Sequence, residues 1–521
     1  MRELGEVLLN KRIFQLIIAT VLLAIPASIT NIMVDAGKNY QDGLKVTGTQ
    51  PMVVRSSHPK NRTVFVHLFE WKWTDIAQEC ENFLGPKGYA GVQVSPPSEH
   101  RVLKDFSWEQ RYQPVSYKLQ SRSGSRAEFA EMVSRCKAAG VDIYVDAIIN
   151  HTTGVLEPGQ VEKGSAGSTF GYFDYPAFKI GDFHHCGRNS NDALQNWYDR
   201  WEVQNCRLLN LADLKTESTS VRRKIASYLN DLMGLGVAGF RIDSAKHIPV
   251  TDLEAIFKQV QGNPFIYQEV IASPGEPIQP EEYLPIGSLT EFRYSWQIAR
   301  SFRSGKLADL QDIGKSQTMI PSDKAVIFTN NHDNQRDQSG TIKTITFKDS
   351  KLHKLANIFM LAWPYGYPQI MSSYAFKDKA QGPPSQANGE TKTIYINGKA
   401  NCFQEWICEH RLPFIANMVG FRNYTQSQNA TASNWWSNGS NQIAFSVANK
   451  GFVAINSSET TLHRQFQTGL PAGTYCNAIA GELISDRSRC TGNAITVDAN
   501  GLAEMQVPPM DAVALYGGQK M

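Results

Sequence analysis

The stretch Val237-Ala-Gly-Phe-Arg-Ile-Asp243 is a short apolar run that ends in charged residues, and residues 220–235 before it show helical spacing of apolar side chains. A helix that alternates with such a strand is the repeat unit of α/β folds. From Thr63 onward the theme recurs, and eight strands are predicted, at residues 63–71, 89–97, 142–151, 237–243, 264–269, 289–292, 325–333 and 368–374. The sequence therefore predicts an α/β protein with a (β/α)₈ TIM barrel.

Two regions depart from the alternation. About 65 residues rich in Gly, Asn, Asp and aromatic side chains separate the third predicted strand from the next helix, too many for an unstructured loop in a compact domain. After residue 424, short alternating runs such as 442–447 replace the helical spacing. We therefore expect a barrel at 61–150 and 214–424, an inserted domain after strand 3 at 151–213, and a C-terminal antiparallel β-sandwich at 425–521.

The N-terminus has the layout of a secretory signal peptide. Lys11 and Arg12 precede an apolar run over residues 13–25, which is followed by small residues at Ala27 and Ser28. The run is shorter than the ~20 residues that span a bilayer, so we expect cleavage after residue 28 and no stable membrane anchor, with an uncleaved anchor as the alternative. Residues 29–60 show no periodicity and are expected to form a flexible lead-in. The protein is thus expected to be secreted.

Eight cysteines in a chain with such a leader favour disulfides over metal thiolates. They fall into sequence neighbours, Cys80 with Cys136, Cys186 with Cys206, Cys402 with Cys408 and Cys476 with Cys490, although eight cysteines allow 105 connectivities. With 52 Lys and Arg against 49 Asp and Glu, the net charge of +3 is too small to indicate a nucleic-acid partner. A neutral substrate and a monomer are expected.

The predicted strands end in polar residues, and in a barrel the carboxyl ends of all strands meet at one rim, where active sites lie. Asp243, Glu269 and Asp333 end the fourth, fifth and seventh strands. Cleavage of a glycosidic bond needs one carboxylate that attacks or stabilises the anomeric carbon and one carboxylic acid of raised pKa that protonates the leaving oxygen. A single strand-end carboxylate more often caps a helix or satisfies a loop, but several strand ends here agree.

Basic residues stand among these acids. Arg241 lies two residues before Asp243 and is expected to keep it ionised, while repulsion among the acids in a partly apolar pocket raises the pKa of one of them. His151 and His332, at the ends of the third and seventh strands, could donate hydrogen bonds to sugar hydroxyls. The rim therefore has the groups that glycoside hydrolysis requires.

Four ordered motifs carry a family resemblance that extends from about residue 61 to the C-terminus. Asp146-Ala-Ile-Ile-Asn-His151, Gly239-Phe-Arg-Ile-Asp-Ser-Ala-Lys-His247, Tyr267-Gln-Glu-Val270 and Phe328-Thr-Asn-Asn-His-Asp-Asn-Gln-Arg336 resemble the signature regions of glycoside hydrolase family 13. His67-Leu-Phe-Glu-Trp71 and Arg111-Tyr-Gln-Pro-Val-Ser-Tyr117 are similar to the animal-type α-amylases of that family.

The resemblance implies hydrolysis of internal α-1,4 bonds of starch and glycogen by a retaining double displacement. It assigns Asp243 as nucleophile, Glu269 as general acid and base, and Asp333 as the residue that binds and distorts the sugar. It places in the sugar subsites Trp108, Tyr112, Gln113, His151, Arg241, Lys246, His247 and His332. It also implies a Ca²⁺ between barrel and insert, held by the side chains of Asn150 and Asp213 and the backbone carbonyls of Gln204 and His247, since Ca²⁺ prefers oxygen donors.

The chain departs from the family pattern at three places. Animal-type enzymes hold an activating chloride with two basic side chains and an amide; here Arg241 and Asn331 match, but the third position is the neutral Gln369. We therefore predict that chloride is not required, with the Gln369 amide replacing part of its role near Glu269. The loop after Arg336 is shorter and poorer in glycine, and Glu109 stands where relatives have a second tryptophan.

Two other readings remain open from the sequence. An α-glucosidase or a transglycosylase would share the four motifs, because these determine the bond chemistry more than the length of the substrate. A barrel without activity, serving as a binding or membrane-associated subunit, is the alternative from another class. Such chains usually lose a carboxylate, whereas this sequence retains all three.

Overall fold

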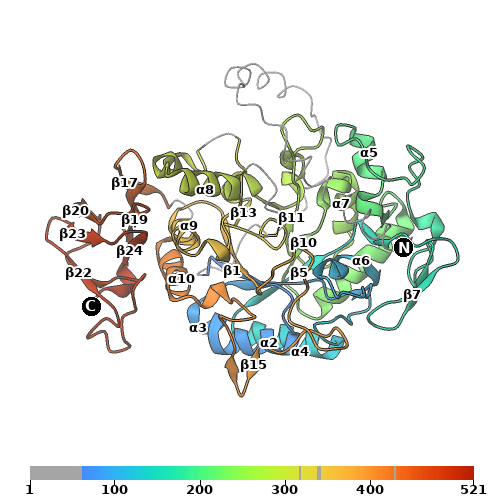
Figure 1. The fold of residues 1–521 in the computed structure, drawn as a ribbon, viewed down its shortest axis with the longest axis horizontal. Coiled ribbons are helices and arrows are strands. Elements are labelled where there is room, and N and C mark those ends of the chain that lie inside the picture. The colour runs from blue at the N-terminus through green and yellow to red at the C-terminus, as the bar shows by residue number, and fades with distance from the viewer. Residues whose placement is uncertain (1–61, 316–317, 337–341, 428–429) are drawn as a thin grey trace.

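Eight parallel strands close into a barrel in the computed structural model, which describes residues 62–315, 318–336, 342–427 and 430–521. The strands follow one another round the barrel in the order β1-β14-β13-β12-β11-β10-β5-β2 (Figure 1). Their bounds are Phe65–Leu68 (β1), Gly91–Val94 (β2), Asp142–Ala147 (β5), Gly239–Ile242 (β10), Phe265–Gln268 (β11), Ser288–Thr290 (β12), Ala325–Ile327 (β13) and Tyr367–Ser372 (β14). The predicted TIM barrel is confirmed.

Large aromatic side chains fill the barrel interior below the polar rim. Phe65 on β1 packs edge-on against Tyr144 on β5, with ring centroids 5.4 Å apart, and against Tyr267 on β11 at 5.8 Å. Phe265 and Tyr367 complete this layer and are almost fully buried. The barrel is therefore a packed core, and ligands can approach only at its ends.

The helices that connect the strands cover the outside of the barrel. They are α2 (Trp73–Glu79), α3 (Gly85–Lys87), α4 (Arg126–Ala138), α6 (Thr219–Gly234), α7 (Val250–Phe257), α8 (Phe292–Ser304), α9 (Lys351–Ala362) and α10 (Pro413–Thr425). Helix α4 begins where Ser125 and Glu128 form a capping box, each side chain bonding the other residue's backbone amide. The helical spacing predicted at residues 220–235 is confirmed as α6, which buries one apolar face.

All the barrel strands are shorter than their predicted ranges, and three of them lead directly into the rim. The run 325–333 is a strand only over Ala325–Ile327, and farther along it the Asn331 side chain accepts hydrogen bonds from the backbone amides of Asp333 and Asn334 and turns the chain. The run 142–151 leaves the barrel after Ala147, and β12 ends at Thr290 so that Phe292 begins α8. The polar residues after each ladder thus form the loops of the rim.

The inserted region has secondary structure of its own. Strand β6 (His151–Gly154) pairs antiparallel with β9 (Leu211–Asp213), and β7 (Val161–Lys163) pairs with β8 (Thr169–Gly171). A short helix, α5 (Arg200–Asn205), precedes β9. The insert lies at the right of Figure 1, at the opposite end of the molecule from the C-terminal region.

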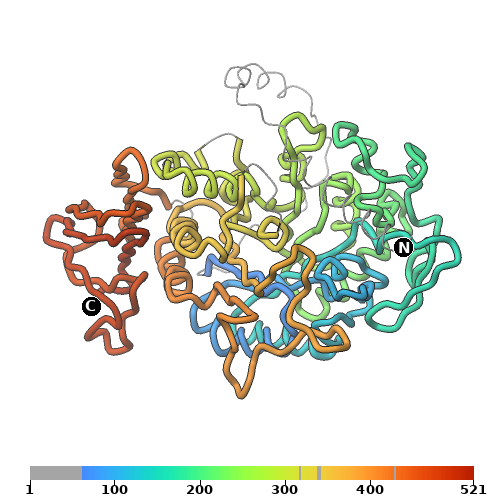
Figure 2. Tube along the Cα trace, viewed as in Figure 1, coloured from blue at the N-terminus to red at the C-terminus, as the bar shows by residue number. Residues whose placement is uncertain are grey.

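The C-terminal region is all β. One sheet has the order β17-β18-β19-β24, and the strand pairs β20-β23 and β21-β22 lie against it. The strands are Ala432–Ser437, Gln442–Val447, Gly451–Asn456, Leu462–Gln467, Gly473–Cys476, Ala494–Val497, Leu502–Val507 and Asp511–Tyr516, numbered β17 to β24. Alternate residues of β18 enter two cores, since Phe445 faces the barrel helices and Ala444 the second layer. Figure 2 shows this region (red) as a separate layer beside the barrel.

Each of the four disulfides joins cysteines that are neighbours in sequence order: Cys80–Cys136, Cys186–Cys206, Cys402–Cys408 and Cys476–Cys490. The predicted signal peptide and lead-in lie outside the described residues, as does the loop over 337–341. No helix within the described ranges has the length and apolar composition needed to cross a membrane.

Candidate active site

Arg241, on β10, is the common partner of four carboxylates at the rim of the barrel. Its Nη1 lies 2.6 Å from Asp146 Oδ1 and 2.8 Å from Asp243 Oδ1, while its Nη2 lies 2.8 Å from Glu269 Oε1. Asp333 Oδ2 is farther from Nη2, at 3.9 Å. The register places Arg241 directly opposite Asp146 on β5 and Tyr267 on β11, so the barrel brings these groups together. Arg241 offsets the repulsion that would otherwise separate the acids.

Ser244 holds the two central carboxylates. Its hydroxyl donates to Asp243 Oδ2 at 2.9 Å and its backbone N–H donates to Glu269 Oε2 at 3.0 Å. The residue has φ +49°, a left-handed conformation that is costly for a serine. That conformation starts the short 3₁₀ helix Ala245–His247 directly after β10. Asp243 and Glu269 are thereby fixed relative to one another by two shared partners, Arg241 and Ser244.

The pKa of Glu269 is raised above its ordinary value, chiefly because the side chain is buried, with the charge of Asp243 adding to the effect. Arg241 opposes this shift. Repulsion among the acids was expected to be the cause, but desolvation is the larger contribution. A carboxyl of raised pKa stays protonated to higher pH and can act as an acid there.

Asp333 stands on the turn that follows β13. Its backbone N–H donates to Asn331 Oδ1 at 3.1 Å, and His332 Nε2 lies 3.2 Å from its Oδ2. Its side chain is 40% exposed, the most open of the three carboxylates. Burial and the positive charge of Arg241 lower the pKa of His332, so that ring remains neutral. Asp333 thus faces the open side of the site.

Aromatic rings line one side of the carboxylates, which we call the Trp108 wall. Tyr112 stacks on His332 with centroids 5.2 Å apart, and its hydroxyl donates to Asp146 Oδ2 at 3.0 Å. Trp108 packs edge-on against both rings, at 5.5 and 5.7 Å, and its indole N–H donates to Lys379 O. Flat apolar rings beside polar groups suit the faces of a sugar.

Arg336 lies behind this wall and is almost completely buried. Its guanidinium carbon lies over the rings of Trp108 and Phe69 at 5.6 and 5.7 Å. Glu109, next to Trp108, is largely withdrawn from solvent, and burial raises its pKa to about 7. Position 109, where the family pattern has a second tryptophan, therefore has a carboxyl group that is neutral in mildly acidic solution.

Two residues that were predicted to bind sugar, His151 and Gln113, form hydrogen bonds with backbone groups. His151 Nε2 lies 2.9 Å from the carbonyl of Tyr112 and therefore donates to it, and Gln113 Oε1 accepts from the Gly154 amide at 3.0 Å. These bonds join the loop of Tyr112 to β6 of the insert. Both side chains therefore position the Trp108 wall. The Nε2 proton of His151 is used in this bond and is not available to a sugar.

Lys246 and His247 form the other side of the site with two residues that sequence reasoning missed. The Lys246 ammonium pairs with Glu276 and lies 5.0 Å from the ring centroid of Trp197, which belongs to the insert. Trp197 packs edge-on against His247 at 5.7 Å, and His247 Nδ1 donates to Val203 O. Trp197 lay in the aromatic-rich insert and Glu276 in an unassigned loop, so only their proximity to Lys246 reveals them. We call this side the Trp197 wall.

Two of the four predicted calcium ligands, Asn150 and Asp213, meet where the insert joins the barrel. Asn150 Nδ2 lies 3.2 Å from Asp213 Oδ1, and His184 Nδ1 lies 2.6 Å from Asp213 Oδ2. Burial raises the pKa of Asp213 to about 6, although the hydrogen bonds from His184 and Asn150 oppose this shift. The described ranges contain no cluster of three or more His, Cys, Asp or Glu side chains suited to a metal. A buried carboxylate and an amide fit a cation that backbone carbonyls also bind.

Gln369, on β14, is directed to a neighbouring amide. Its Nε2 donates to Gln93 Oε1, and Gln93 Nε2 donates to Asp146 Oδ2 at 3.1 Å. Since Asp146 also binds Arg241, Gln369 is connected to Arg241 through two side chains. Asn331, which with Arg241 matches the family's chloride-binding positions, uses its Oδ1 to accept from the backbone amides of Asp333 and Asn334.

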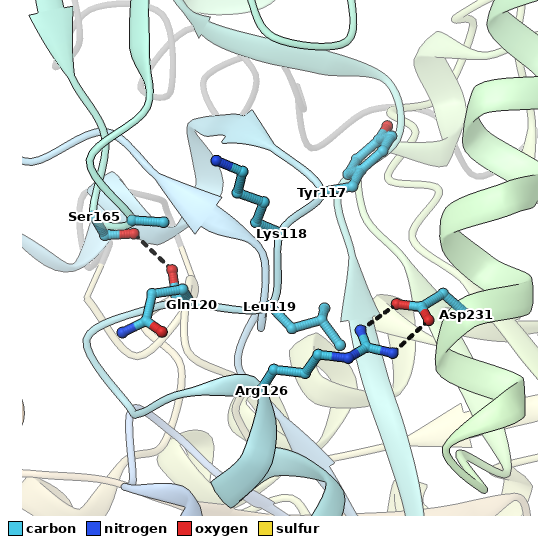
Figure 3. A pocket seen from close by; sticks show the side chains of 8 residues that line it. Tyr117, Lys118, Leu119, Gln120, Arg126, Ser165 and Asp231 are labelled. Atoms are coloured by element: carbon cyan, nitrogen blue, oxygen red, sulfur yellow. Dashed lines mark hydrogen bonds and ion pairs between the residues drawn. The ribbon is translucent and has the colours of Figure 1, made fainter.

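A surface cavity of about 720 Å³ lies elsewhere, where the insert meets α4 and α6. Figure 3 shows Arg126 of α4 paired with Asp231 of α6 across it, at N–O distances of 2.5 and 2.6 Å, and Ser165 of the insert bonded to the Gln120 carbonyl. None of the three carboxylates lines this cavity. It is a crevice between two parts of the fold, and its size does not identify the active site.

A closed parallel barrel whose rim holds Asp243, Glu269 and Asp333 around one arginine defines a class of protein, the barrel glycoside hydrolases. Comparison with known proteins narrows the class. Residues 104–269 match the model of the α-amylase catalytic domain, and residues 435–518 match that of the α-amylase C-terminal all-β domain.

The chain is 42% identical to the pancreatic α-amylase 2a5 of Mus musculus, over 86% of this chain and 92% of that protein. It is 45% identical to the α-amylase of Pecten maximus, over 88% and 93%. A crystal structure of a variant of α-amylase I from Eisenia fetida with maltohexaose superposes with a TM-score of 0.81 at 38% identity, over 88% of this chain and 98% of that one. The chain belongs to the animal α-amylases of glycoside hydrolase family 13.

Proposed function

We propose that the protein cleaves internal α-1,4 bonds of starch and glycogen by a retaining double displacement. Asp243 Oδ1 and Glu269 Oε1 are bound by one guanidinium, and Ser244 bonds the other oxygen of each. This shared clamp is the observation that carries the proposal. It favours the short separation of about 5–5.5 Å typical of retaining enzymes over the ~6.5–9.5 Å of inverting ones.

In this mechanism Asp243 attacks the anomeric carbon while the protonated Glu269 gives its proton to the departing glycosidic oxygen. The products of this step are a glucosyl ester on Asp243 and a released chain end. Glu269, now ionised, takes a proton from water, which attacks the ester and restores both groups. Asp333 binds the distorted ring from the open side, and Arg241 orients Asp243 through their 2.8 Å ion pair.

The substrate is a glucan longer than two units, because aromatic walls flank the carboxylates on both sides. The maltohexaose bound by the Eisenia fetida relative supports this choice. Product analysis on starch tests the proposal: short maltooligosaccharides are expected. Release of glucose alone would support an α-glucosidase, transfer products a transglycosylase, and no release an inactive binding subunit.

We further propose that Ca²⁺ joins the insert to the barrel through Asn150 and Asp213 and the carbonyls of Gln204 and His247. When bound, the ion supplies a positive charge beside a buried carboxylate and no reactive group. Asn150 follows β5 and Asp213 ends β9, so an ion bound by both would cross-link two parts of the fold.

The protein is also proposed to be secreted, which agrees with its disulfides and with its relatedness to a pancreatic enzyme.

Removal of calcium is expected to lower the melting temperature. A ligand at one hundred times its Kd stabilises the folded state by about 2.7 kcal/mol, so a chelator should produce a clear downward shift. In the variant Asp213→Asn the chelator should have little further effect. Asp174→Asn, an exposed carboxylate of the same insert, is the matched control and should keep the full response. Equal melting of the wild type with and without chelator would contradict the calcium site.

Chloride is proposed to be unnecessary because Gln369 supplies no second positive charge and is bonded to Gln93. Chloride-free enzyme is expected to show the same kcat before and after chloride is added at constant ionic strength. The variant Gln369→Arg introduces a buried charge and is expected to make activity rise with chloride. A large activation of the wild type by chloride would refute this part of the proposal.

A further inference from the structure

Three aromatic residues lead from the active site onto the open surface of the insert. Trp197, Tyr198 and Trp201 lie within five consecutive positions; the first two precede α5, and Trp201 is in its first turn. Trp197 is partly buried in its wall, whereas the next two rings are exposed, Tyr198 by 62% and Trp201 by 44%. Exposed large apolar rings that adjoin a binding site often mark a surface that a ligand covers.

Contacts make this surface continuous with the Trp197 wall. The Tyr198 ring lies beside Gly275. A Cβ atom added at Gly275 would be 3.9 Å from Tyr198 Cε1. Gly275 precedes Glu276, whose carboxylate pairs with Lys246 over the Trp197 ring. A chain that passes Lys246 and Glu276 on its way out of the site would therefore reach Tyr198 next.

The exposed rings are held by a firmly anchored element. Arg200 binds both oxygens of Glu282 on the barrel, at 2.9 Å each, and the Val203 carbonyl accepts from His247. Trp201 is covered on one face by Arg188, whose guanidinium carbon lies 4.7 Å from the ring centroid. Aromatic rings on an anchored segment have few rotatable bonds and lose little conformational entropy when a ligand binds.

We propose that Tyr198 and Trp201 extend the glucan cleft beyond the Trp197 wall and bind additional glucose units of long α-1,4-glucans. The rings stack on sugar faces, and Arg188 and Asp199 beside them offer a donor and an acceptor to hydroxyl groups. The ligand is a neutral polysaccharide, because this line of aromatic rings starts at the carboxylates that are proposed to cleave the glucan. The inference rests on the proposed function.

The test compares a long and a short substrate, amylose and a chromogenic glycoside of maltotriose. For Tyr198→Ala and Trp201→Ala, kcat/KM on amylose should fall about two- to tenfold per ring, mainly through KM, given the usual contribution of aromatic contacts. On the short glycoside both variants should match the wild type, which also shows that they are folded. Tyr198→Phe should retain activity on amylose.

Tyr172→Ala is the matched control, since Tyr172 is a 39% exposed tyrosine of the same insert, beside β8. It should leave the ratio of the two activities unchanged. Equal losses on both substrates, or an unchanged ratio in the Tyr198 and Trp201 variants, would overturn the extended cleft while leaving the proposed function intact. A wild type that cleaves neither substrate would overturn both.

Discussion

Replacing Asp243 with asparagine is expected to reduce kcat on starch by about 10⁴- to 10⁶-fold, the usual consequence of removing a covalent nucleophile. An amide oxygen is a poor nucleophile and cannot form the glucosyl ester. Arg241 retains Asp146 and Glu269 as partners, so the fold should persist. The measurement is the rate of reducing-end release, together with the melting temperature.

Asp312→Asn is the control for this variant, because Asp312 is an exposed carboxylate that pairs with Lys315, with 78% of its side chain open to solvent. It should keep wild-type activity. If Asp243→Asn retained substantial activity while folded, another residue would have to act as the nucleophile, and the assignment of the four motifs would be wrong.

Glu269→Gln is expected to lower kcat on starch by roughly 10²- to 10⁴-fold, the usual range for loss of an acid and base catalyst. A glutamine cannot protonate the leaving oxygen, although it can keep the hydrogen bond from the Ser244 amide. Formation of the glucosyl ester from aryl glycosides with good leaving groups should suffer less, because their departure needs little protonation. Burst kinetics on such substrates would separate the two steps.

The pH profile gives a second test of Glu269. Because burial raises the pKa of Glu269, the protonated acid persists to higher pH than for an ordinary glutamate, and kcat/KM should fall as pH rises through that raised pKa. This alkaline fall should disappear in Glu269→Gln. Glu504→Gln, at an exposed carboxylate of the C-terminal region, should keep the wild-type profile. An unchanged profile in the Glu269 variant would assign the acid to another group.

Much of the fold was predictable because the spacing of apolar residues along the chain differs between helices and strands. Alternation of strands and helices predicted the barrel, and the long Gly- and aromatic-rich interval predicted the insert. Boundaries were less accurate where side chains bond the backbone in place of a neighbouring strand, as in the run 325–333, where Asn331 accepts from two amides of a turn. Propensity cannot show such local competition for backbone groups.

The candidate site was predictable only in part. Lys246 and His247 were found because they follow a signature strand, but Glu276 and Trp197 come from a loop and from the insert, at unrelated sequence distances. The roles of Gln113 and His151 also changed, since their polar atoms bond backbone groups of neighbouring segments. Sequence spacing cannot reveal which of several polar partners a side chain meets after folding.

The sequence by itself determined the barrel and its rim of carboxylates, because parallel strands closed into a barrel must present all their carboxyl ends at one side. Only the tertiary structure decided how those groups work together. It made Arg241 and Ser244 the shared partners of Asp243 and Glu269, buried Glu269 enough to raise its pKa, and linked Gln369 to Gln93. These properties depend on short distances between residues far apart in the chain and on the removal of these residues from water. Both arise only once the barrel has closed.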